Sequence, residues 1–109
     1  MAHQDLEEME KALDRAHAHA VAWLGSLGDR PVPARVDADA VTEALGGDLP
    51  DGPTAAADVV DLLAGAVEPG LVAMPSGRFF GFVIGGSHPA ALAADWLVGA
   101  WTRTPCSGR

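Results

Sequence analysis

The chain has 109 residues, and its acidic side chains outnumber its basic ones by 15 to 7, which gives a net charge of −8. This charge repels nucleic-acid phosphates and anionic membranes, so neither is an expected partner. The length allows at most one small domain. The single cysteine, Cys106, excludes an internal disulfide and favours a cytoplasmic setting. The acidic start does not resemble a signal peptide, and no apolar run is long enough for a membrane span.

The clearest predicted helix runs from Asp5 to about Gly25. Its apolar residues recur at spacings of three and four, which places them on one stripe. They are Leu6, Met9, Leu13, Ala16, Ala20, Trp23 and Leu27. Such a stripe must pack against the rest of the chain or against a partner subunit.

A connector and a short helix follow. Two prolines in residues 30–36 (RPVPARV) predict an extended connector. Asp37 or Asp39 can then cap a short helix that runs through Ala44, and the glycine pair 46–47 ends it.

A second long helix is predicted after a proline- and glycine-rich turn. Thr54 is expected to cap it, and it should run to about Val67 with Val60 and Leu63 on one face. Pro69 and the glycine after it should stop this helix.

The last part of the chain joins an aromatic run to an alanine-rich helix. Residues 79–84 are short, apolar and aromatic, which predicts an extended segment buried on both sides. Ser87 or His88 can cap a final helix from Ala90 to Trp101, which is apolar almost all round and would need neighbours on several faces. The predicted fold is therefore mainly α, with one short extended Phe-rich segment.

Sequence motifs for metal binding or nucleophilic catalysis are weak. His17 and His19 are two residues apart on a predicted helix, so they should point to nearly opposite sides and cannot chelate one ion. Ser87 beside His88 lacks the glycine that a nucleophile elbow needs two residues after the serine, because Pro89 stands there. The glycines before Ser87 are interpreted as a turn with an N-cap rather than an anion site. No catalytic, metal or cofactor-binding residue is predicted.

Three pieces of the chain together resemble the amino-terminal region of the group II pyridoxal-phosphate-dependent decarboxylases, a family that includes aromatic amino acid, glutamate and histidine decarboxylases. The pieces are RPVPARV, VEPGLVAMPSGRFFGF and GGSHPAALAADWLVGAW, and the resemblance spans about residues 12–101. It implies that residues 1–101 form the helical amino-terminal region of a type I fold enzyme.

The resemblance also implies a set of partners and site residues. In that family the region wraps around the other subunit of a homodimer and packs on the cofactor domain. Gly81, Phe82 and Val83 would help to line the pocket for an amino acid substrate, although physical reasoning alone favours a core role for the phenylalanines. The family's Schiff-base lysine, pyridine-binding aspartate and stacking histidine have no match here. The only lysine, Lys11, lies among acidic residues, so the chain is not expected to bind pyridoxal phosphate alone.

Residues 102–109 depart from the family pattern. Restoring one base to an assumed coding sequence for TRTPCSGR gives Asp-Gln-Asn-Ala, which the relatives carry after this tryptophan. We therefore expect a reading-frame shift after Trp101 and an aberrant tail. The alternative interpretation of the chain is a non-enzymatic helical interaction module.

Overall fold

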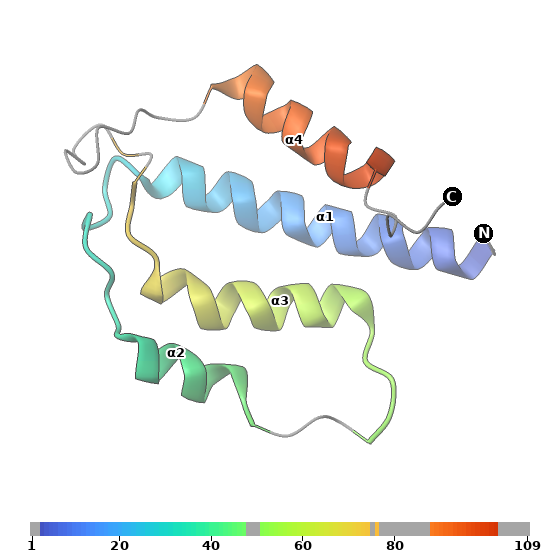
Figure 1. Ribbon diagram of the computed structural model, residues 1–109, viewed down its shortest axis with the longest axis horizontal. Coiled ribbons are helices and arrows are strands. Elements are labelled where there is room, and N and C mark those ends of the chain that lie inside the picture. Colours follow the sequence, from blue (N-terminus) through green and yellow to red (C-terminus); the bar gives the residue numbers. More distant parts are fainter. Residues whose placement is uncertain (1–2, 48–50, 75, 77–87, 103–109) are drawn as a thin grey trace.

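The computed structural model describes residues 3–47, 51–74, 76 and 88–102, and it is helical (Figure 1). The α-helices are α1 (His3–Ser26), α2 (Ala38–Leu45), α3 (Ala56–Val67) and α4 (Pro89–Thr102), and a 3-10 turn, η1 (Glu68–Gly70), follows α3. None of the described residues forms a strand. The mainly α prediction is confirmed for this part of the chain, whereas the predicted extended Phe-rich segment, residues 79–84, lies outside the described residues.

The helices form a single layer in the order α4, α1, α3, α2 (Figure 1). α3 lies between α1 and α2 and contacts both of them. No described helix is long and apolar enough to cross a membrane.

The proline-rich connector is tied to the segment after α3 by backbone hydrogen bonds. The backbone amides of Arg35 and Val36 donate to the carbonyl oxygen of Pro69 at 2.8 and 3.2 Å, and that of Ala73 donates to the oxygen of Val32 at 2.8 Å. The prolines cannot donate, so these bonds use the amides and carbonyls that remain in the connector. The connector thus closes the end of the layer at which α1 finishes.

Both predicted ends of α2 and one of the two residues proposed to cap α4 are confirmed. The Asp37 side chain accepts a hydrogen bond of 2.9 Å from the Ala40 amide, and Gly46 ends α2 with a φ of 83°. Such a positive φ favours glycine because it has no Cβ. At α4, His88 Nδ1 accepts from the Ala90 amide at 3.1 Å, and Pro89 occupies the first helical position, where its missing N–H has no cost.

The predicted cap at Thr54 is wrong. α3 begins at Ala56, its N-cap is Ala55, and no side chain caps it. Thr54 therefore precedes the N-cap by one residue, where its hydroxyl no longer fits the geometry of a cap to the first-turn amides. At the other end, α3 stops at Val67 as predicted. α4 continues to Thr102, one residue beyond the expected boundary at 101.

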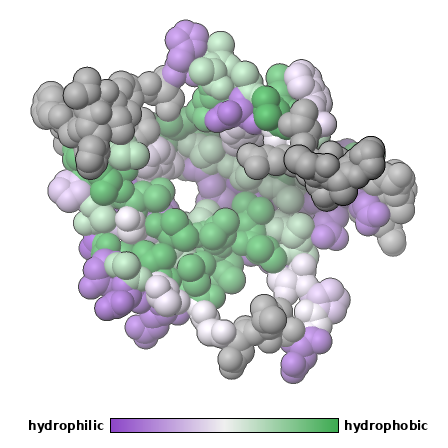
Figure 2. All heavy atoms as spheres, viewed as in Figure 1, coloured by the Kyte–Doolittle hydropathy of each residue, from purple (hydrophilic) through white to green (hydrophobic). Residues whose placement is uncertain are grey.

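Very little of the described chain is buried. Among the described residues only Ala66, Ala73 and Ser76 are buried, and none of them is large. Figure 2 shows apolar side chains gathered on the surface over α3. Large apolar residues are exposed on all four α-helices: Leu6, Met9, Leu13, Val21, Leu45, Val59, Leu62, Leu63, Trp96, Leu97, Val98 and Trp101. A single layer of helices cannot enclose a core, since stable domains bury their apolar faces between at least two layers.

The stripe predicted on α1 is only half covered. Ala16, Ala20, Trp23 and Leu27 are partly buried, whereas Leu6, Met9 and Leu13 remain about half exposed. α3 runs beside the carboxy-terminal part of α1, and the amino-terminal end of α1 extends beyond it (Figure 1).

Candidate functional site

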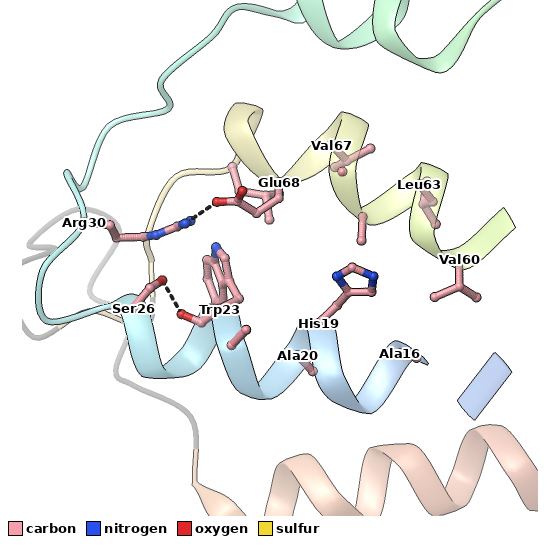
Figure 3. A pocket seen from close by; sticks show the side chains of 14 residues that line it. Ala16, His19, Ala20, Trp23, Ser26, Arg30, Val60, Leu63, Val67 and Glu68 are labelled. Carbon is pink, nitrogen blue, oxygen red and sulfur yellow. Dashed lines mark hydrogen bonds and ion pairs between the residues drawn. The ribbon is translucent and has the colours of Figure 1, made fainter. Parts of the chain in front are cut away.

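A groove of about 520 Å³ lies between α1 and α3, which also contact each other directly. Its walls are mainly apolar, with small residues such as Ala16 and Ala20 on α1 facing Val60, Leu63 and Val67 on α3 (Figure 3). The space-filling view is open between these two helices (Figure 2). This volume lies within the range of small-molecule sites, about 300–1,000 Å³.

One ion cluster joins the two walls at Asp61 of α3. Its Oδ1 accepts hydrogen bonds from Arg15 Nε at 2.8 Å and from His19 Nε2 at 2.7 Å. The hydrogen bond from Arg15 and then that from His19 hold the pKa of Asp61 below its usual value. Because all three side chains are partly exposed, solvent screens these ion pairs.

A second ion cluster lies at the end of the groove where α1 meets the connector. Glu68 accepts hydrogen bonds from Arg30, and Arg35 Nη2 donates to both of its carboxylate oxygens at 2.8 and 3.0 Å. Burial raises the pKa of Glu68, but the hydrogen bond and charge of Arg30, followed by those of Arg35, outweigh it and lower the pKa overall. The Arg30 guanidinium also lies over the Trp23 ring, 5.7 Å from its centroid.

Most polar side chains that line this groove form hydrogen bonds or ion pairs with other residues of the chain. Ser26 Oγ donates to the Trp23 carbonyl oxygen at 2.6 Å, and His19, Arg30 and Glu68 are engaged in the two ion clusters. Trp23 Nε1 is buried and has no hydrogen-bond partner among the described residues. The groove is therefore suited to contact with apolar groups rather than to acid–base or nucleophilic chemistry.

A second groove, of about 570 Å³, lies between α1 and α4. The backbones of these helices stay more than 8 Å apart, Cα to Cα. The rings of His17 and Trp96 meet edge to face, with centroids 6.1 Å apart and an interplanar angle of 85°. The lining residues are His17, Ala20, Val21, Leu24, Pro89, Leu92, Ala93, Trp96 and Leu97. Apart from His17, all of them are apolar.

The structure separates the two histidines as their spacing predicts. His17 contacts α4, whereas His19 bonds to Asp61 of α3, so they point to opposite sides of α1. Within the described part of the chain, no group of three or more potential ligands is arranged to hold a metal ion. Lys11 is exposed and lines neither groove.

The expected substrate-pocket residues, Gly81, Phe82 and Val83, lie outside the described residues. The sequence reasoning missed both ion clusters, which join residues 33 to 46 positions apart. No spacing rule pairs residues over such separations. The only available signal was the presence of Arg30 and Arg35 in a connector that also holds two prolines.

Comparison of the sequence with protein-family models, with curated proteins and with solved structures found no match. The assignment of a function therefore depends on the residues and on their arrangement.

The lowered pKa values of Asp61 and Glu68 predict acid sensitivity. The folded state holds fewer protons on these groups than the unfolded chain does, so their stabilisation is present above the ordinary carboxyl pKa of about 4. It is lost as the pH falls through the lower folded-state values. Thermal unfolding followed by circular dichroism should show the midpoint falling with pH in this range. The double variant Asp61→Asn, Glu68→Gln should lose less on acidification, and an equal loss would contradict the assignment.

Proposed function

We propose that this chain is the amino-terminal helical segment of a group II pyridoxal-phosphate-dependent amino acid decarboxylase. In this role it contributes an interface to a larger cofactor domain and to the second subunit of a homodimer. It performs no chemistry of its own. Gly81, Phe82 and Val83 supply part of the wall of the substrate pocket in the complete enzyme.

The observation that carries this proposal is the uncovered apolar surface of the helical layer. Leu62 and Leu63 on α3 are 53% and 54% exposed, and Trp101 on α4 is 72% exposed. Exposed apolar surface of this kind marks sites of protein–protein contact. A large domain packed on one side of the layer would supply the second layer that the helices lack.

The sequence adds independent support. The connector, the helix end with the following Phe-rich stretch, and the Gly-Gly-Ser-His-Pro run that leads into α4 occur in the family's order. The structure describes all of the connector, residues 30–36, and residues 88–101 of the third piece.

The described residues do not fit a pyridoxal phosphate site. A Schiff base needs a lysine in a sheltered pocket, whereas Lys11 is exposed and is surrounded in sequence by Glu8, Glu10 and Asp14. The decarboxylation chemistry is therefore assigned to the larger domain, and no step of it is assigned to this chain.

A non-enzymatic interaction module is the second candidate. The same exposed apolar faces favour it, and it differs from the first candidate only in its partner.

Association with a truncated decarboxylase tests the proposal. A group II decarboxylase that lacks its amino-terminal helices should co-purify with this chain and gain decarboxylase activity, because the chain restores the missing interface. The enzyme's own amino-terminal segment, added separately, is the positive control. Leu62→Lys should weaken the association by placing a charge on the apolar face, while Glu43→Gln, at an exposed position on α2, should leave it unchanged.

The result that would overturn the proposal is equally specific. If the enzyme's own segment rebinds and this chain neither binds nor restores activity, the chain is not an equivalent segment, and the interaction module becomes the better assignment.

A further inference from the structure

The groove between α1 and α4 combines an apolar floor with an acidic margin. Its floor is formed by Val21 and Leu24 of α1 and by Leu92, Trp96 and Leu97 of α4. Val21 is 53% exposed and Leu97 is 48% exposed, so the floor is open to a partner.

The margin of the groove follows from the helical repeat of α1. Glu10 and Asp14 precede His17 by seven and three residues, so all three lie on the same side of the helix. Glu10 and Asp14 are exposed and extend the groove-lining face of α1 toward its amino terminus. α4 contributes no basic side chain, and its one charged residue is Asp95.

The cations of the described chain do little to offset this charge. Arg15 is paired with Asp61, and both Arg30 and Arg35 are paired with Glu68. The remaining described cation is Lys11, which follows Glu10 directly. The described side chains along the margin of the groove therefore carry a net negative charge.

We propose that the α1–α4 groove binds an amphipathic helix of another polypeptide, with basic residues beside its apolar stripe. Apolar side chains at spacings of three and four enter between α1 and α4, and lysine or arginine residues meet Glu10 and Asp14. The inference is independent of the proposed decarboxylase role, because it rests on this groove and its charges alone.

The net charge distinguishes this occupant from two other apolar surfaces that fit the groove. A second copy of the chain brings another net charge of −8 and the same acidic margin, so the two copies repel each other. An anionic lipid surface is repelled in the same way. A basic helix gains both the apolar contact and the attraction.

A synthetic helix provides the probe. A fluorescein-labelled peptide of leucine and lysine, about 18 residues or five helical turns long, carries leucines at i, i+3, i+4 and i+7. Fluorescence anisotropy should show saturable binding to the full chain that weakens as salt is added. A scrambled peptide of the same composition should bind about tenfold more weakly or not at all, because its leucines do not form a stripe.

Matched variants place the binding in the groove. Val21→Lys puts a charge on the groove floor and should weaken binding about tenfold. Leu62→Lys changes an equally exposed residue, 53% in both cases, on α3 away from this groove and should have no effect. Glu10→Gln with Asp14→Asn should weaken binding and flatten its salt dependence, while Glu43→Gln on α2 should change neither. Circular dichroism checks that each variant keeps its helices.

Four outcomes would overturn the proposal. The first is no saturable binding of the peptide, and the second is equal binding of the scrambled peptide. The third is an equal effect of Val21→Lys and Leu62→Lys. The fourth is evidence of another occupant, in either of two forms. A dimer that is seen by sedimentation equilibrium and is broken by Val21→Lys would assign the groove to a second copy. Binding to phosphatidylcholine vesicles that Val21→Lys abolishes would assign the groove to a lipid surface.

Discussion

Replacing Glu68 with glutamine is expected to lower the free energy of unfolding by about 1–3 kcal/mol. The carboxylate accepts from Arg30 and, through both oxygens, from Arg35, so it fixes the connector to the end of α3. Glutamine keeps the size but removes the negative charge that attracts the Arg30 guanidinium, which is only 15% exposed. For a chain with this little buried surface, such a loss is a large share of its stability. Urea denaturation followed by circular dichroism measures it.

The control for this variant is Glu43→Gln, which changes the same pair of residue types at an exposed position on α2. It should alter the free energy of unfolding by less than about 0.5 kcal/mol. If the two variants unfold at the same urea concentration, the contacts of Glu68 with Arg30 and Arg35 do not stabilise the fold.

Replacing Gly70 with alanine should destabilise the chain by a similar amount, about 1–3 kcal/mol. A Cβ built at Gly70 would lie 2.5 Å from Val41 Cγ2, well inside van der Waals contact. The added methyl group would force η1 away from α2, at the place where the two elements pack together. Thermal and urea unfolding of the variant measure the loss. The second substitution Val41→Ala removes the opposing methyl groups and should restore part of the stability.

Gly65→Ala is the matched control, and its expected effect has the opposite sign. Gly65 lies in the interior of α3, and nothing lies within 4 Å of a Cβ placed there. Alanine in a helix interior is favoured over glycine by about 0.5–1 kcal/mol, so this variant should be more stable. Destabilisation by both alanines would show that the close approach of Gly70 to Val41 is not the cause.

Local structure was largely predictable because it depends on neighbours in sequence. The apolar spacing predicted α1. Asp37 or Asp39 was expected to cap the short helix and Ser87 or His88 the final one, and the structure shows Asp37 and His88 in these positions and Gly46 at the end of α2. The prediction that Thr54 caps α3 was wrong because the presence of a good capping residue does not fix where a helix begins. Ala55 and Ala56 have no strong local preference for being the first helical residue, so α3 starts one position later than expected.

The arrangement of the helices was not predictable, because it depends on contacts between distant residues. Arg15 pairs with Asp61 where α1 meets α3, and Arg30 pairs with Glu68 where the connector meets η1. The sequence indicated that the final helix would need cover on several faces. It contained no signal that α4 would lie beside α1 with its backbone more than 8 Å away. Both grooves result from that arrangement, so neither was a candidate from the sequence.

The separation of α4 from its neighbour has a consequence for how the molecule opens. An isolated helix of 14 residues is marginal in water, and α4 meets α1 through the edge contact between Trp96 and His17 while the two backbones stay apart. Its amide protons should therefore exchange with solvent through openings that leave the α1–α3 ion clusters intact. The chain then behaves as two cooperative units of unequal strength. A molecule that binds along folded α4 lowers the fraction of molecules in which α4 is open, and this effect grows with the free concentration of that molecule.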